Sequence, residues 1–449
     1  MSNQSKHHAS GRSSLSRRDF LHVTALASVA ATVTGCDKVA ETTMRPPPVI
    51  TKSPERIRVG VIGCGWRGRG AAWDAVQAAE NVQIVALGDL FPDRVEEARN
   101  WLVETAGKAN RADSVQITPE RCFSGFDNFK GVLGCDLEMV VLAAPPGFRP
   151  PHYAAAIEAG KHVFMEKPVA VDPVGFRQVV AASELAQQRG LAVVAGTQRR
   201  HQPHYLEALR RIHDGQIGEV RGAQCYWNQG ELWVKKQEPN WSDMEWQCRN
   251  WLYFTWLSGD HIVEQHVHNL DVVNWAMQAT PVKCVGMGGR AARTAPEFGH
   301  IYDHFAVEYE YPNGVRTLSM CRQVKGSSDR VAEVIVGTHG VAHLNSNTAK
   351  ITGRRNWEFD DGGNAVNPYV QEHTDLIASI RAGRPLNEGR QVAESTLTAI
   401  MGRMSAYTGR ELQWSWLQSA SELNLMPAKL EMGPLSAGEV AIPGVTKLV

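Results

Sequence analysis

The segment GDHIVEQHVHNLD, residues 259–271, gathers imidazole and carboxylate side chains that could move a proton. Glu264 and His268 are four residues apart, so on a helix they would share one face. An unperturbed imidazole titrates near pH ~6.5 and a lysine near ~10.4, so histidine is the easier base at neutral pH. A histidine of this segment could therefore act as a general base.

Two other interpretations of this segment stay open. His266 and His268 could meet one metal ion only in an extended chain, whereas Glu264 and His268 could do so on a helix. The segment could also be no more than the polar start of a helix at a sheet edge. No Cys-x-x-Cys pair occurs among the eight cysteines, so a zinc ribbon is not expected, and no metal is predicted.

A glycine-rich turn early in the chain could hold a phosphate. Its pattern is GxGxxG, and its residues are Gly63, Gly65, Trp66, Arg67 and Gly68. In this pattern the first glycine makes the tight turn, the second lets the backbone approach a pyrophosphate, and the third lets a helix pack on its strand. The start of that helix then offers free N–H groups to the phosphate. We predict that these five residues bind a dinucleotide.

The stretches around this turn match the strand, helix and strand that the pattern needs. Residues 57–62 form a β-branched run typical of a buried strand, residues 71–79 have a helical pattern, and residues 82–87 form a second strand. Asp89 follows that strand, 21 residues after the last glycine. A carboxylate there binds the ribose hydroxyls and repels a 2′-phosphate, so NAD is predicted over NADP. Arg94 weakens that preference only slightly.

Three further strand-like runs end at residues that should border the same site. The runs cover 138–144, 162–165 and 191–195, with a predicted helix at 152–160. Ligands of parallel sheets lie outside the carboxyl ends of the strands. The residues at these ends that we expect beside the cofactor or substrate are Ala144, Pro145, Glu166, Lys167 and Arg199.

From residue 218 onward the pattern changes to long strand-like runs, which predict a mostly antiparallel sheet. Pro312-Asn313-Gly314 lies between two of them and is typical of a hairpin turn. The runs cover 220–227, 282–288, 304–311, 315–323, 331–336 and 349–352. The chain is therefore predicted to be an α/β protein, with a doubly wound parallel sheet followed by an α/β domain with a large open sheet.

The stretches GVIGCGWRG and AGKHVFMEKP, together with the histidine segment, resemble the Gfo/Idh/MocA oxidoreductases over most of residues 56–420. The resemblance implies an NAD(P)-dependent enzyme with a Rossmann domain and a second domain whose open sheet often mediates dimers or tetramers. It also implies that Lys167 lies by the nicotinamide and the substrate hydroxyl, and that Glu264 and His268 complete the catalytic set. Within that set we expect His268 to be the general base, with Glu264 orienting it or binding a neighbouring hydroxyl. The family more often has Asp at the position of Glu264 and Gly at that of His266. This departure affects the expected substrate orientation more than the reaction type.

Substrate contacts are predicted on weaker grounds. The candidates are Arg199, His266, Tyr369 and His373. Tyr369 and His373 are four apart on a predicted helix, so both could face the pocket, although core or surface packing explains them equally well. The 13 tryptophans suit sugar faces, but Trp is also common core filler. The formal net charge of +0 argues against nucleic acid or an anionic membrane as a general partner.

The first 55 residues are predicted to be an export signal and a linker. Arg17-Arg18 precedes a short apolar stretch, as in a twin-arginine signal, and the sequence VTGC ending at Cys36 resembles a lipoprotein box. Ordinary cleavage nearby is the alternative to acylation of Cys36. The predicted parts are a signal at 1–36, a linker at 37–55, a cofactor domain at 56–196, a substrate and oligomerisation domain at 197–420, and an arm at 421–449 that could wrap a neighbouring subunit.

Together these features predict an exported homodimer or homotetramer, periplasmic or lipid-anchored, that oxidises a secondary hydroxyl of a sugar, glycoside or cyclitol with bound NAD. Free NAD is scarce outside the cytoplasm, so the cofactor is expected to stay bound and to be recycled in place. One alternative is a redox-neutral enzyme that cleaves or epimerises a glycoside through a ketosugar. Another, from a different class, is a non-catalytic sugar-binding lipoprotein.

Overall fold

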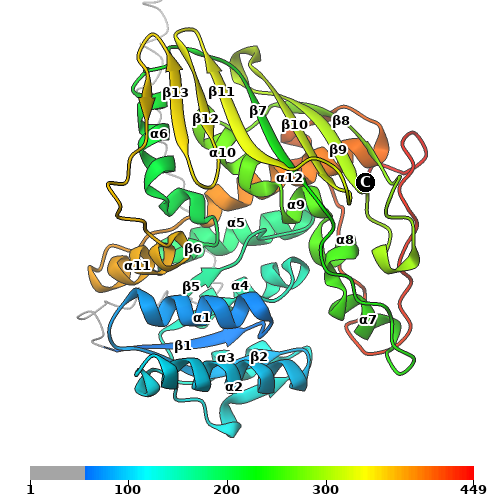
Figure 1. Ribbon diagram of the computed structural model, residues 1–449. Helices are drawn as coiled ribbons and strands as arrows, with labels where there is room; N and C mark the ends of the chain where they lie inside the picture. Colours follow the sequence, from blue (N-terminus) through cyan, green and yellow to red (C-terminus); the bar gives the residue numbers. More distant parts are fainter. Residues whose placement is uncertain (1–55) are drawn as a thin grey trace, which may run out of the picture. The chain divides into compact units, whose positions relative to one another are not determined.

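The computed structural model describes residues 56–449, and within that range the strands form two sheets linked by helices (Figure 1). The predicted twin-arginine signal, the lipoprotein box at Cys36 and the linker lie outside the described residues. Within the described range, every helix is too short or too polar to cross a bilayer.

The first sheet is parallel throughout, with the order β3-β2-β1-β4-β5-β6 of a doubly wound Rossmann domain. The strand order reverses between β1 and β4, and the crevice at such a reversal is where these sheets bind ligands. The strands are β1 (Ile57–Ile62), β2 (Val82–Asp89), β3 (Cys122–Ser124), β4 (Met139–Leu142), β5 (His162–Met165) and β6 (Val193–Ala195). The predicted fold of this half is confirmed, and β1 and β5 have the bounds that the sequence predicts.

The helices of this half begin with α1, which starts at Trp66, five residues before the predicted helix. Its N-cap is Gly65, which has no side-chain cap, so the first-turn N–H groups stay free for a ligand. The helix starts early because the last residues of the GxGxxG turn are themselves helical. The helices are α1 (Trp66–Ala78), α2 (Pro92–Lys108), α3 (Asn128–Leu133), α4 (Arg149–Glu158) and α5 (Pro173–Gln188).

The second sheet has the order β14-β13-β12-β11-β7-β10-β9-β8-β15. Only the pair β7 and β10 is parallel in this sheet, so the predicted mostly antiparallel sheet is confirmed. The predicted turn at 312–314 joins β9 to β10, with Asn313 and Gly314 at positive φ. The strands are β7 (Val220–Gln229), β8 (Lys283–Gly289), β9 (His304–Glu310), β10 (Arg316–Gln323), β11 (Arg330–Gly337), β12 (Gly340–Leu344), β13 (Ala349–Gly353), β14 (Trp357–Glu358) and β15 (Leu412–Gln413).

Helices cover one face of this sheet, where α9, α10 and α12 pack against its central strands (Figure 1). The other face leaves apolar side chains exposed, among them Val285, Met287, Leu318 and Met320. The helices of the second half are α6 (Pro203–His213), α7 (Asp243–Arg249), α8 (Thr255–Ser258), α9 (His261–Glu264), α10 (Val267–Met277), α11 (Pro368–Arg381), α12 (Gly389–Thr408) and α13 (Trp414–Ser419).

Helix α11 returns to the Rossmann half, although it lies far along the chain. Its Leu376, Ile377 and Ile380 share an apolar core with Ala71 and Ala75 of α1. The Rossmann layer therefore contains a helix from the end of the chain, which the sequence pattern did not predict.

The predicted arm at 421–449 contains no helix or strand and folds back on its own chain. Tyr302 donates a hydrogen bond to the Ala441 carbonyl at 2.8 Å, and the Leu425 amide donates to Asp172 at 2.8 Å. We expected this arm to wrap a neighbouring subunit. These hydrogen bonds hold the arm on its own chain, whereas some of its apolar side chains, such as Ile442 and Val445, are exposed, and the contact with a neighbouring subunit stays a prediction.

Candidate active site

The three glycines of the turn after β1 have different surroundings. A Cβ on Gly63, whose φ is +95°, would lie 2.2 Å from the Ala144 nitrogen, and a Cβ on Gly68 would lie 1.7 Å from the Gly63 oxygen. A Cβ on Gly65 would meet nothing within 4 Å. Packing therefore requires glycine at the first and third positions. The second faces open space, which a pyrophosphate on the α1 N-terminus would fill.

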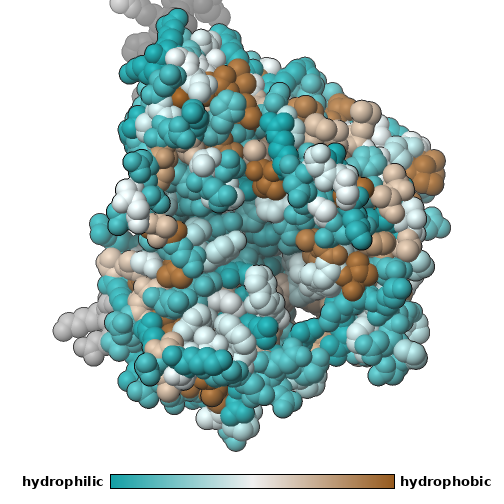
Figure 2. All heavy atoms as spheres, in the orientation of Figure 1, coloured by the Kyte–Doolittle hydropathy of each residue, from teal (hydrophilic) through white to brown (hydrophobic). Residues whose placement is uncertain are grey.

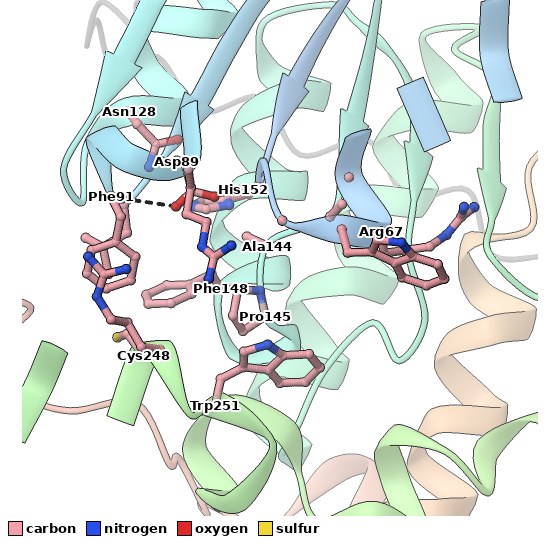
Figure 3. A pocket seen from close by; sticks show the side chains of 18 of the residues that line it. Arg67, Asp89, Phe91, Asn128, Ala144, Pro145, Phe148, His152, Cys248 and Trp251 are labelled. Atoms are coloured by element: carbon pink, nitrogen blue, oxygen red, sulfur yellow. Dashed lines mark hydrogen bonds between the residues drawn. The ribbon is translucent and has the colours of Figure 1, made fainter. Parts of the chain in front are cut away.

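This space belongs to a cavity of about 310 Å³ that the Rossmann half lines together with residues of the second half (Figure 3). Figure 2 shows that this side of the molecule is hollowed between the two halves. Of the predicted cofactor residues, the cavity is lined by Gly63, Gly65, Trp66, Arg67, Gly68, Asp89, Ala144 and Pro145. Predicted residues from three strand ends therefore meet at one cavity.

Asp89 stands at the carboxyl end of β2 and borders this cavity. It accepts hydrogen bonds from the Cys64 amide at 2.6 Å and the Phe91 amide at 3.0 Å, which fix its orientation. Figure 3 shows the bond from Phe91. Burial raises the pKa of this carboxyl group. Each carboxylate oxygen can accept more than one hydrogen bond, so Asp89 can still receive a ribose hydroxyl. Asp89, the space at Gly65 and the uncapped helix start together fit a dinucleotide.

Lys167 and Glu264 come from different halves and meet directly. The Lys167 Nζ donates to the Glu264 carbonyl at 2.5 Å and to Glu264 Oε1 at 3.0 Å. Their side chains are 11% and 9% exposed, so the pair is nearly closed to solvent. Glu264 Oε2 has no partner among the described residues, and it is free to accept a hydroxyl hydrogen.

His268 is buried on α10, with its ring stacked on Trp227 at a centroid distance of 5.7 Å. Burial, and then the charges of Lys167 and Arg199, hold its pKa well below the usual range for histidine. The imidazole is therefore neutral at pH 7, and Nδ1 has no partner among the described residues. The spacing of Glu264 and His268 would place them on one face of a shared helix. In the structure Glu264 ends α9 and His268 lies on α10, so the two residues are on separate helices.

Comparison with known proteins settles the family. The family described as "Oxidoreductase family, NAD-binding Rossmann fold" matches residues 57–209, and the GFO/IDH/MocA C-terminal domain matches residues 205–343. The chain belongs to the Gfo/Idh/MocA oxidoreductases. It is thus a member of a family of NAD-binding oxidoreductases, and the predicted cofactor NAD is confirmed.

Individual relatives are similar over different lengths. Inositol 2-dehydrogenase 4 of Saccharopolyspora erythraea is 31% identical over 38% of this chain and 46% of its own length. A glycosyl hydrolase family 109 protein of Solibacter usitatus is 32% identical over 38% and 37%. The chain thus spans less than half the length of these two relatives. Inositol 2-dehydrogenase 3 of S. erythraea is 26% identical over 73% of this chain and 87% of its own.

Solved structures share the fold at low identity. A crystal structure of aldose-aldose oxidoreductase from Caulobacter crescentus, complexed with glycerol, superposes with a TM-score of 0.61 and 18% identity. The match covers 80% of this chain and 99% of that one. It shows that this Gfo/Idh/MocA protein has the fold of that enzyme.

Arg67 forms ion pairs with three carboxylates. It pairs with Glu166, with Asp74 at 2.9 Å and with Glu372 at 3.4 Å, and its guanidinium lies 5.0 Å from the Tyr369 ring centroid. Burial and the nearby Glu166 raise the pKa of Glu372 well above its usual value. Arg67 therefore positions Glu166, and Tyr369 lies beside both as a half-exposed ring.

The remaining predicted substrate residues are occupied or buried. Arg199 forms a buried ion pair with Glu333, which also accepts a hydrogen bond from Asn269 at 2.6 Å. His266 is 0% exposed and bonds Ser319 at 2.7 Å, and His373 is 0% exposed with its ring 4.0 Å from that of Phe164. A substrate contact was predicted for both histidines. Both rings are enclosed by neighbouring side chains, and their contact with a substrate stays a prediction.

Sequence reasoning missed two residues at this site. Trp227 stacks on His268, and Arg149 is buried within the electrostatic influence of Glu166 and Glu264. Burial lowers the pKa of Arg149 to about 10. The aromatic end of the predicted strand 220–227 was a usable signal for Trp227, whereas nothing in the local sequence singled out Arg149. Within residues 56–449, no group of three His, Cys, Asp or Glu side chains is placed to hold a metal ion.

Proposed function

We propose that the protein oxidises a secondary hydroxyl of a sugar, glycoside or cyclitol with a tightly bound NAD. The observation that carries the proposal is the meeting of Lys167 and Glu264 next to a neutral, buried His268. A carbinol oxygen in this place would have a base, a cationic hydrogen-bond donor and a free carboxylate oxygen around it.

The roles follow from the charge states. NAD, when bound, supplies the acceptor for the hydride that leaves the carbinol carbon. His268 takes the hydroxyl proton, because only a neutral imidazole can accept one. Lys167 donates a hydrogen bond to the oxygen as its negative charge develops, and Glu264 Oε2 accepts from a neighbouring hydroxyl. The carbon–oxygen double bond of the ketosugar forms as the hydride and proton leave.

A redox-neutral cycle is the second candidate. In it the ketosugar would undergo elimination, hydrolysis or epimerisation, and the hydride would then return. The family 109 glycosyl hydrolase among the relatives and the aldose-aldose oxidoreductase among the solved structures make this candidate worth testing. A non-catalytic sugar-binding lipoprotein fits less well, because such a protein would not need the Lys167, Glu264 and His268 grouping.

Export and assembly are part of the proposal. The twin-arginine pattern supports export of the folded, cofactor-loaded protein to the periplasm, and Cys36 supports a lipid anchor. Exposed Val285, Met287, Leu318 and Met320 lie on one face of the open sheet and support a homodimer or homotetramer formed through that face.

The test is the absorbance of the purified protein without added cofactor. Cyclitols, free aldoses and methyl glycosides are added in turn, and product masses then distinguish a ketosugar from a cleaved glycoside. Reduced-nicotinamide absorbance should rise with at least one class, and Lys167→Ala should lose about 100-fold or more of that rate. No rise with any class, together with no nucleotide released on denaturation, would contradict the proposed function.

A further inference from the structure

The cofactor cavity has a second wall that the glycine motif does not supply. Residues on this wall come from the second half of the chain, and they are Trp233, Lys235, Cys248, Arg249 and Trp251. Figure 3 shows Cys248 and Trp251 on the side of the cavity opposite Asp89 and Phe91. We call residues 230–251, which contain this wall, the cover segment.

The cover segment is fastened to the Rossmann half beside Asp89. Arg249 makes two hydrogen bonds to Asp93, at 2.9 and 3.0 Å, and its guanidinium lies 3.8 Å from the Phe91 ring centroid. Asp93 is 48% exposed, so the ion pair alone is weak. The two-pronged geometry and the cation–π contact add to it.

Hydrogen bonds join the two parts of the cover segment. Asn250 is 0% exposed, accepts from the Lys235 amide at 2.9 Å and donates to the Glu297 carbonyl at 2.7 Å. Trp246 donates to the Lys235 carbonyl at 2.8 Å. The two parts of the wall, around Lys235 and around Arg249, therefore move together.

The C-terminal arm holds the cover segment from behind. Gln247 donates to the Leu435 carbonyl at 2.8 Å, and the Met244 amide donates to the Gly433 carbonyl at 3.1 Å. Met244 and Cys248 share an apolar cluster with Phe148, and Leu435 packs against that cluster. Lifting the cover would expose this cluster to water, which opposes opening.

We propose that the cover segment, braced by the arm, closes over the dinucleotide and keeps it bound between turnovers. The inference rests on the proposed function, since it assumes NAD in the cavity. Release of the dinucleotide then requires that the Arg249–Asp93 ion pair and the contacts between the cover segment and the arm both break. A cofactor held in this way would be recycled in place.

The rate of NADH release from the intact protein tests the cover. The protein is loaded with NADH, excess NAD is added, and the loss of NADH fluorescence is followed. Trp251→Ala removes a wall and should speed release about fivefold or more, by analogy with base–aromatic stacking. Asp93→Ala removes only the fastening, is not part of the cavity wall, and should speed release about two- to fivefold.

Asp136→Ala is the matched control. Like Asp93, Asp136 is an exposed aspartate that pairs with an arginine, but that arginine is Arg58, and the pair lies within the Rossmann half, before β4. It should release NADH at the wild-type rate. Wild-type release from both Trp251→Ala and Asp93→Ala, with NADH still bound stoichiometrically, would overturn the cover and leave the proposed function intact. Wild-type protein that neither carries nor binds nucleotide would overturn both.

Discussion

Burial sets the chemistry of the individual side chains at this site. His268 loses its charge because it is enclosed and lies near Lys167 and Arg199. Glu264 keeps one oxygen paired with Lys167 and one without a partner among the described residues. A neutral base on α10 and a carboxylate oxygen on α9 therefore both lie near Lys167.

The pH profile and the variant His268→Gln test the base. Because the folded pKa of His268 lies well below 6.5, its unprotonated form persists as pH falls through 6.5. The rate of nicotinamide reduction should therefore hold at pH 6 instead of halving near 6.5. His268→Gln should lower that rate by about 10²- to 10⁴-fold with nucleotide still bound. A wild-type rate that declines around 6.5, or a variant near full rate, would refute this role.

The sequence predicted those site residues that belong to a recognisable local pattern. The GxGxxG turn, Asp89 and Lys167 each lie at or just after the end of a strand, so strand ends located them. The substrate roles of His266 and His373 stay predictions, because a residue type alone does not say which way a side chain faces once a helix packs. Arg149 was missed because its surroundings depend on how the chain folds: Glu166 follows the next strand, and Glu264 comes from the second half of the chain.

At the scale of elements, the turn between β1 and α1 joins packing to binding. Gly68 is packed against Gly63, whereas Gly65 faces open space at the uncapped start of α1. The same residue type thus serves the fold at one position and the ligand at the other.

Two matched variants separate these uses. Gly65→Ala should fold normally but lose bound nucleotide, because its methyl group enters the space for the pyrophosphate. Gly68→Ala should destabilise the protein by about 1–3 kcal/mol, because its methyl group meets the Gly63 carbonyl. Thermal unfolding and nucleotide content, measured on both, check the pair. Equal nucleotide content in Gly65→Ala and wild type would argue against a pyrophosphate there.

Strands and helices could be predicted where they are long enough to show a repeating pattern of apolar residues. Long strands such as β7, β9 and β10 were found, whereas β14 and β15, with two residues each, carry no period. The packing of α11 on α1 was not foreseen, because the two helices are some 300 residues apart and only the folded chain brings them together.

At the scale of the described molecule, three parts of the chain form or brace the cofactor cavity. The Rossmann half supplies one wall, the cover segment supplies the other, and the arm braces the cover. Such enclosure is useful to an enzyme that is exported with its cofactor, since no external pool of NAD would replace a lost one. The twin-arginine pattern and the enclosed cavity thus lead to the same expectation of a resident cofactor.

Hydride transfer to resident NAD is the central claim, and an isotope tests it most directly. A sugar or cyclitol that raises the nicotinamide absorbance is prepared with deuterium on its ring carbinol carbons and mixed with purified protein, without added cofactor. The bound nucleotide is then released and weighed by mass spectrometry. We predict reduced nicotinamide carrying one deuterium. Reduced nucleotide without deuterium, or no reduced nucleotide at all, would contradict the claim.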